Sequence, residues 1–220
     1  MIQMDNVVLK RSRRFSLAID HLSLEAGTCY GLIGRNGSGK SSLLKLISKA
    51  IAPDRGSIKV NSQQPVVALS PSASFPNTMR LQTIAKLIAK PGWQEDRWLN
   101  CLGILGIDAK SRYGKLSTGE QAATRLAAYI AQPRDIWLLD EVLLGVDIIA
   151  SQQMLSMLGQ CFADDAPCLL YTSHNTSELE RLADEILLID NGQVQDIGAP
   201  DHTENTFSQH IFKCLQGEAA

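Results

Sequence analysis

The sequence lacks a long apolar run, a signal-peptide pattern and an excess of charge of either sign. The longest uncharged stretch, residues 60–79, is interrupted by Ser, Gln, Asn and Pro. It therefore falls short of the ~20 apolar residues that a membrane-spanning helix needs. Residues 1–10 show no basic segment followed by an apolar one, so we do not expect secretion. We expect a chain that does not cross a membrane by itself.

Charge and cysteine content further limit which partners and which cellular compartment we expect for the protein. The 21 Lys and Arg residues nearly balance the 23 Asp and Glu residues, which gives no electrostatic basis for nucleic acid as a partner. Any anion must then be bound by local groups. The five cysteines are scattered and odd in number, a pattern typical of a reducing cytosol. A chain of 220 residues buries roughly 70% of its unfolded surface and needs no disulfide to fold.

Apolar periodicity predicts an α/β fold. Short apolar segments predict strands at 29–33, 58–60, 66–69, 136–139, 168–172 and 186–189. Apolar spacing of three and four predicts helices at 40–50, 81–90, 98–106, 118–131, 149–162 and 177–183. Strands that alternate with helices indicate a mainly parallel sheet.

One stretch departs from this alternation. Residues 78–131 contain no convincing strand, and they read as a helical insertion bounded by Pro71 and Pro76 on one side and Pro133 on the other. The polar end of the chain predicts a peripheral helix at 207–215.

The clearest motif is a glycine-rich loop between a predicted strand and a predicted helix. Gly34-Arg-Asn-Gly-Ser-Gly-Lys40-Ser41 fits G-x-x-x-x-G-K-[ST], in which backbone N–H groups and the lysine hold phosphates and the last hydroxyl binds Mg²⁺. The alternative, a glycine-rich turn with a surface lysine, is disfavoured by the complete match in this context. The residues expected to contact nucleotide are Gly34, Arg35, Asn36, Gly37, Ser38, Gly39, Lys40, Ser41 and Ser42.

Two carboxylates follow the apolar strand Ile136-Trp-Leu-Leu-Asp140-Glu141. At the carboxyl edge of a parallel sheet they would lie beside the phosphate loop. Asp140 would then hold Mg²⁺ through water, and Glu141 would act as the general base toward an attacking water. Taken alone, such a pair is more often a solvated turn or a helix cap.

A third segment, Leu116-Ser-Thr-Gly-Glu-Gln121, introduces the helix at 118–131. Ser117 fits an N-cap, and Glu120, three residues on, fits its capping-box partner. With the two motifs above and Thr172-Ser-His174 after a strand, the set resembles the ATP-binding subunit of ABC transporters. Ser117 precedes Asp140 by 23 residues, and Asp140 precedes His174 by 34, in the order that this family uses.

The resemblance covers roughly residues 1–195 and implies a P-loop NTPase fold. It implies a single ABC ATP-binding domain over 1–220, with a catalytic core at 1–77 and 132–220 and a helical signature subdomain at 78–131. An N-terminal region of antiparallel strands belongs to the same expectation.

The family also implies an activity and partners. The chain would be an ATPase that uses ATP and Mg²⁺, with Ser41 and Asp140 on the metal. Two copies would form a head-to-tail homodimer in which Ser117, Gly119 and Glu120 meet the γ-phosphate of the ATP bound to the other copy. His174 would contact the γ-phosphate and support the water activated by Glu141. In this arrangement Asp147 would communicate between the two ATP sites.

The resemblance implies that the protein is located at the inner, cytoplasmic face of the cell membrane. There the homodimer would drive a separate integral membrane permease. Phe75 and Met79 are candidates for the permease contact, and both fit equally well in the core of the helical insertion.

Three departures from the family pattern stand out. Thr118 takes the place of a usual glycine. No glutamine follows the strand at 66–69, so Ser70 or Ser72 would substitute, or the metal would rely on Ser41 and Asp140 alone, and we expect slower or differently coupled hydrolysis. The N-terminal region, which in this family supplies an aromatic ring that stacks on adenine, here offers mainly cations. The candidates are Phe15 and, through guanidinium stacking, Arg11, with a solvated basic turn as the alternative.

The transported substrate stays open. Asp140-Glu-Val, the following Gly145-Val-Asp147 and the short chain are similar to polysaccharide exporters, whereas residues 31–40 are shared with siderophore-type importers. A non-transport ABC ATPase is a further alternative, although such proteins carry tandem cassettes or long insertions. A degenerate nucleotide binder would explain the missing glutamine but not the intact Lys40 and Glu141.

Overall fold

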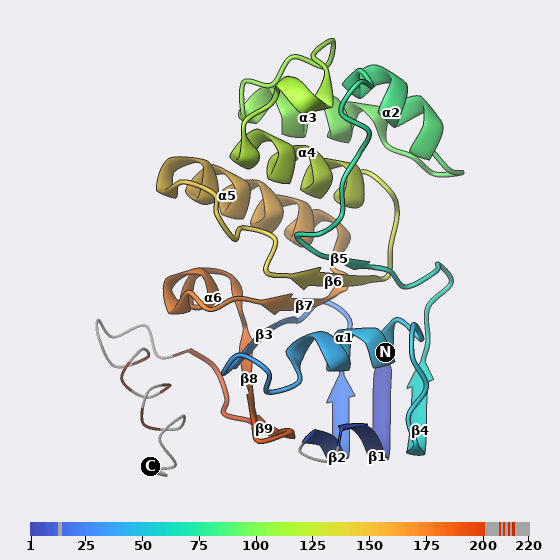
Figure 1. Cartoon of the computed structure of the whole chain (residues 1–220), viewed down its shortest axis with the longest axis vertical. Helices are drawn as coiled ribbons and strands as arrows, with labels where there is room; N and C mark the ends of the chain where they lie inside the picture. Colours follow the sequence, from blue (N-terminus) through green and yellow to red (C-terminus); the bar gives the residue numbers. More distant parts are fainter. Residues whose placement is uncertain (13–14, 201–206, 208, 210, 212, 214–220) are drawn as a thin grey trace. The chain divides into compact units, whose positions relative to one another are not determined.

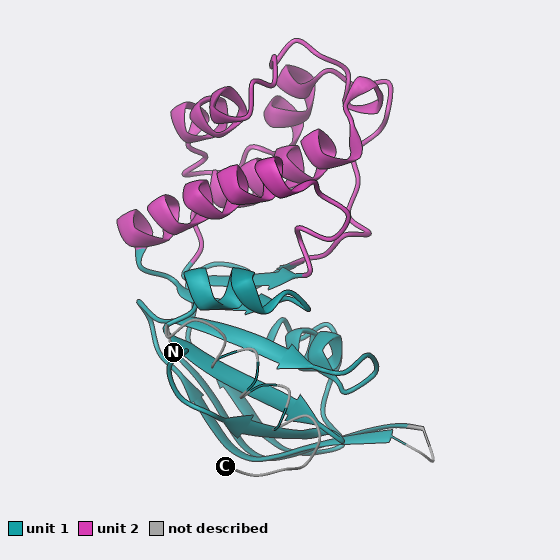
Figure 2. Ribbon diagram, turned by 90° about the vertical axis from the view of Figure 1, so that its left-hand side faces the viewer, with its two compact units in different colours: residues 1–68, 135–140, 166–220 teal, residues 69–134, 141–165 magenta. Residues whose placement is uncertain are grey.

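The computed structural model describes residues 1–12, 15–200, 207, 209, 211 and 213. It divides into two compact units, one of residues 1–68, 135–140 and 166–220 and the other of residues 69–134 and 141–165 (Figure 2). The helix expected at 207–215 lies largely outside the described residues. Within the described part of the chain, no helix combines the length and the apolar character needed to span a membrane.

The first unit is built on a mixed sheet (Figure 1). Its elements are β1 (Ile2–Ser12), β2 (Phe15–Leu24), β3 (Cys29–Gly34), α1 (Lys40–Ile47), β4 (Arg55–Val60), β6 (Ile136–Asp140), β7 (Cys168–Thr172), α6 (Thr176–Leu182), β8 (Glu185–Asp190) and β9 (Gln193–Asp196). With β5 (Ala68–Leu69), the strand order among the described residues is β4-β1-β2-β9-β8-β3-β7-β6-β5.

Parallel and antiparallel pairing divide this sheet. Strands β8, β3, β7 and β6 run parallel, whereas β1 pairs antiparallel with β2 and β4. The predicted α/β fold with a mainly parallel core and an N-terminal antiparallel region is therefore confirmed.

The parallel strands are short and apolar because both of their faces are covered. Every residue of β3 and β7 is buried. Helix α1 contributes Leu43, Leu44 and Leu46 to the same core cluster as the inward-facing residues of β1 and β2. The phosphate-loop segment between β3 and α1 is thus anchored at both ends by buried apolar side chains.

The second unit is helical. It contains α2 (Leu81–Ile88), α3 (Glu95–Ile104), a 3₁₀ turn (Tyr113–Lys115), α4 (Thr118–Ile130) and α5 (Ile148–Asp165). Arg97 of α3 pairs with Asp165 of α5, with Nη2 donating to Oδ1 at 2.9 Å. The Phe75 ring meets the buried Tyr113 edge-on, with ring centroids 5.4 Å apart, so Phe75 packs within the helical unit.

The strands differ from the sequence expectation more than the helices do: apolar segments gave no bounds for β1 and β2, and β4 begins three residues before the expected 58–60. The strand expected at 66–69 is reduced to Ala68–Leu69, because Pro65 brings no N–H to the start of the strand and Val67 is 47% exposed. Strand β9 was not predicted, because Gln193–Asp196 carries a single apolar residue and shows no readable alternation.

Candidate active site

Three neighbouring parallel strands of the first unit end at the same edge of the sheet. Strand β7 lies between β3 and β6, and Thr172 pairs with Leu32 on one side and with Asp140 on the other. The phosphate loop after β3, the carboxylate at the end of β6 and the loop after β7 therefore leave the sheet together. This is where ligands bind in open α/β sheets.

The phosphate loop needs glycine for two different reasons. A Cβ on Gly34 would lie 2.3 Å from the Ile189 carbonyl oxygen, so any side chain there would collide with the backbone of β8. Gly39 has φ +121°, a conformation that side chains disfavour, at the residue that caps α1. Helix α1 has no acidic residue in its first turn, so its positive N-terminal end is not neutralised there.

The side chains of the loop fit a phosphate ligand. Ser38 Oγ is buried and is among the few side-chain polar atoms of the described residues that are buried without a hydrogen-bond partner. Such a group is expected where a ligand supplies the partner. The buried Lys40 ammonium donates to the carbonyl oxygens of Gly34 at 2.9 Å and Arg35 at 3.3 Å, which holds its charge at the loop.

The remaining predicted loop residues lie at its tip and in the first turn of α1. Arg35, Asn36 and Gly37 are exposed, Ser41 is exposed and Ser42 is half-buried. An anion could therefore reach the loop from solvent.

Asp140 is oriented by the neighbouring strand. The hydroxyl of Thr172, fully buried, donates to Asp140 Oδ1 at 2.8 Å. The described residues hold no group of three or more His, Cys, Asp or Glu side chains that could hold a metal ion. Mg²⁺ at NTPase sites takes only one or two protein ligands beside substrate phosphates, so Ser41 and Asp140 fit that donor set. Thr172 stands in the Thr172-Ser-His174 motif, but the motif does not predict its bond to Asp140, because that bond depends on strand register.

Glu141, the residue after Asp140, has a strained backbone conformation. Its φ is +48°, in the left-handed region that a residue other than glycine adopts at a cost. Its carbonyl oxygen accepts a hydrogen bond from the Leu144 N–H at 3.0 Å, so the chain turns sharply after β6. Strain of this kind is typical of functional sites.

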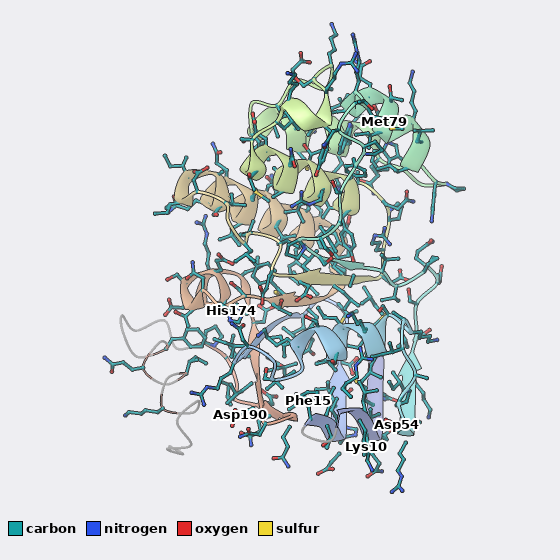
Figure 3. All side chains as sticks on the ribbon, viewed as in Figure 1. Lys10, Phe15, Asp54, Met79, His174 and Asp190 are labelled. Atoms are coloured by element: carbon teal, nitrogen blue, oxygen red, sulfur yellow. The ribbon has the colours of Figure 1, made fainter. Side chains whose placement is uncertain are left out.

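His174 is exposed in the short loop between β7 and α6 (Figure 3). Its neighbours Ser173 and Asn175 are hydrogen-bonded to each other, with the Asn175 N–H donating to Ser173 Oγ at 3.0 Å. Residues 173–175 therefore form a defined turn directly after a buried strand.

The predicted cap at Ser117 in the second unit is confirmed. Ser117 Oγ accepts from the Glu120 N–H at 3.2 Å, and the Ser117 N–H donates to Glu120 Oε2 at 2.7 Å. Gly119 lies close to Asp147, since a Cβ there would be 3.8 Å from Asp147 Oδ2. Asp147 in turn accepts from the Ala150 N–H at 3.0 Å near the start of α5.

The structure separates the two candidates for adenine contact. A Cβ on Gly39 would lie 3.0 Å from Phe15 Cζ, so the half-buried Phe15 ring lies against the phosphate loop (Figure 3). Arg11 is exposed near the end of β1. In the second unit, the hydroxyl oxygens of Ser70 and Ser72 are hydrogen-bonded to each other at 2.8 Å.

Comparison with known proteins identifies the family. The family model described as ABC transporter matches residues 17–143, more than half of the chain. The aliphatic sulfonates import ATP-binding protein of Rhodococcus jostii is 30% identical over 173 residues, which are 78% of this chain and 64% of that protein. The thiamine import ATP-binding protein of a Jannaschia species is 28% identical over 213 residues, which are 88% of this chain and 91% of that protein.

A solved structure shows the same fold. A dimeric bacterial ABC transporter cassette superposes with a TM-score of 0.72 at 18% identity, covering 90% of this chain and 98% of that one. The chain therefore belongs to the family of ATP-binding, ATP-hydrolysing subunits of ABC transporters.

Proposed function

We propose that the chain is the ATPase subunit of an importer, working at the cytoplasmic face of the cell membrane with a separate integral membrane permease. One observation carries the proposal. The phosphate loop, the Thr172-bonded Asp140 and the loop of His174 leave one sheet edge in neighbouring strands. These are the parts that phosphoryl transfer to water requires.

Each residue has a distinct task in this proposal. Lys40 and the loop N–H groups bind the phosphates, and Ser41 with Asp140 would hold Mg²⁺, which supplies charge neutralisation on the phosphate oxygens. Glu141 takes the proton of the attacking water as general base. His174 donates a hydrogen bond to the γ-phosphate, and Phe15 offers its ring to adenine.

A second copy would complete the site. The N-terminal end of α4, with Ser117, Gly119 and Glu120, would face the γ-phosphate bound by the other copy. Asp147 is in place to sense that contact because it neighbours Gly119. The dimeric cassette with the same fold supports pairing of this kind.

The relatives favour import over export. Both curated relatives reported above are import proteins by name, for sulfonates and for thiamine. They therefore weigh against the polysaccharide-type exporter that Asp140-Glu-Val and the short chain favoured. We propose that the transported substrate is a small solute, and a siderophore is included in that class. Phe75 packs on Tyr113, which favours the insertion core over a permease contact for that residue.

Membrane co-isolation separates the transporter from a non-transport ABC ATPase. A tagged chain, expressed at its native level and purified after mild detergent extraction, should bring down one integral membrane protein in stoichiometric amount. Recovery of the whole pool without any membrane protein would contradict the proposal.

A further inference from the structure

One oxygen of the Glu178 carboxylate on α6 accepts hydrogen bonds from two hydroxyl groups. Tyr171 Oη donates to Glu178 Oε2 at 2.6 Å, and Ser173 Oγ donates to the same oxygen at 2.7 Å. Tyr171 is fully buried and Ser173 nearly so. Charge-assisted hydrogen bonds of this length are among the strong ones in proteins.

The same carboxylate holds both neighbours of His174. Ser173, which donates to Glu178, also accepts from the Asn175 N–H at 3.0 Å. Asn175 Oδ1 accepts from the Ser177 N–H at 3.1 Å, which caps α6, while Asn175 Nδ2 lies 3.4 Å from Glu178 Oε1. The turn that carries His174 is thus tied on either side to one side chain.

Tyr171 fixes the donor side of this network. Burial raises the pKa of Tyr171, and the nearby Glu178 charge adds to this, so the phenol keeps its proton and continues to donate. Strand β7 thus holds two carboxylates through consecutive residues: Tyr171 donates to Glu178, and Thr172 donates to Asp140.

We propose that Glu178 is a positioning residue for His174, holding the turn 173–175 so that the imidazole meets the γ-phosphate during hydrolysis. The proposal rests on the role given to His174 above. Glu178 itself touches neither nucleotide nor water in this account. Its effect is on turnover, because misplacing a group near the reacting atoms by about 1 Å can cost ~100-fold in rate.

Two substitutions test the acceptor role. Glu178→Ala should lower kcat for ATP by about 10- to 100-fold while KM for ATP stays within about twofold. Glu178→Gln should restore most of the loss, because the amide oxygen still accepts both hydroxyls. The control is Glu180→Ala, which removes the same charge from the same helix and should keep wild-type kcat.

A double-mutant cycle separates positioning from a general structural role. In a His174→Ala background, Glu178→Ala should cause less than about a twofold further loss of residual turnover, because the group it positions is gone. Losses that multiply would overturn the proposal. Ser173→Ala, which removes only the anchor of the turn, provides a second variant if Glu178→Ala fails to fold, and it should show the same non-additivity with His174→Ala.

The outcomes distinguish the role of His174 from the role of Glu178. If His174→Ala keeps wild-type turnover, the role of His174 fails, and the proposal for Glu178 fails with it. If His174→Ala loses turnover while both Glu178→Ala and Ser173→Ala keep it, only the positioning proposal is overturned.

Discussion

Single residues of the phosphate loop follow from the sequence because their roles are local. Gly34 and Gly39 are required by a close backbone approach and by a positive φ, and both lie in a motif that reads directly from spacing. The same holds for Ser117 and Glu120, which are three positions apart and form the predicted capping box.

Residues that act across the sheet could not be read in this way. Thr172 reaches Asp140 only because β7 pairs with β6 in one particular register. Glu178 reaches Ser173 only because α6 folds back beside its own preceding turn. A hydroxyl or carboxylate at such positions has no spacing signal, so only the folded chain reveals it.

Lys40 supplies the first residue-scale prediction. Lys40→Ala should lower ATP turnover by at least about 100-fold, because it removes the charge held at the phosphate loop. The measurement is steady-state phosphate release. Lys45→Ala, an exposed lysine one turn further along α1, is the matched control and should keep wild-type turnover. Equal losses in both variants would argue against a specific phosphate contact.

The second residue-scale prediction concerns the reactivity of the cysteines. A hydrogen bond from Cys101 lowers the pKa of Cys161, which lines a groove of about 530 Å³ with Arg97. Burial raises the pKa of Cys168 to about 12, and burial also raises the pKa of Cys29 well above its usual range. Alkylation proceeds through the thiolate. In a Cys214→Ser chain at pH 8, iodoacetamide should therefore label Cys161 first, as read by peptide mass spectrometry.

The control for this prediction removes the donor. Cys101→Ala should raise the pKa of Cys161 and slow its labelling at pH 8, with the difference shrinking as pH rises and the thiolate forms in both chains. Labelling of Cys29 or Cys168 as fast as Cys161 would contradict the assignment.

At the scale of elements, helices were easier to predict than strands. Apolar spacing places the helices predicted between residues 40 and 183 within three residues of their observed ends, because each must bury one face whatever it packs on. Strands β5 and β9 are short and carry little apolar pattern, so pairing partners elsewhere in the chain decide whether they form: β5 lies at one edge of the sheet, and β9 lies between β2 and β8.

The cap of α4 gives the prediction at this scale. Ser117→Ala should lower the free energy of unfolding by about 1 kcal/mol, because Ser117 Oγ accepts from the Glu120 N–H. Ser117→Asp should restore stability, since aspartate also caps, but it should abolish ATP-dependent pairing by placing a negative charge where the γ-phosphate is received. Denaturant unfolding and sedimentation measure the two effects, and pairing by Ser117→Asp as strong as wild type would contradict the role of this helix end.

At the scale of the whole molecule, the order of the motifs predicted the family and the α/β fold. The extent of each compact unit could not be predicted, because it depends on which residues pack together in the folded chain. The pattern at 149–162 predicts a helix without saying what it packs against. In the structure, α5 belongs to the second unit, where Asp165 pairs with Arg97 of α3. An ion pair between residues 68 positions apart leaves no periodic trace in the sequence.

We propose above that this chain holds half of each ATP site and closes it by pairing. The most direct measurement is the oligomeric state of Glu141→Gln, which lacks the proposed general base, by analytical ultracentrifugation with Mg²⁺ and either ATP or ADP. We expect a dimer with ATP, a monomer with ADP, and a monomer with ATP once Lys40→Ala is added. A Glu141→Gln chain that binds ATP and stays monomeric would contradict it.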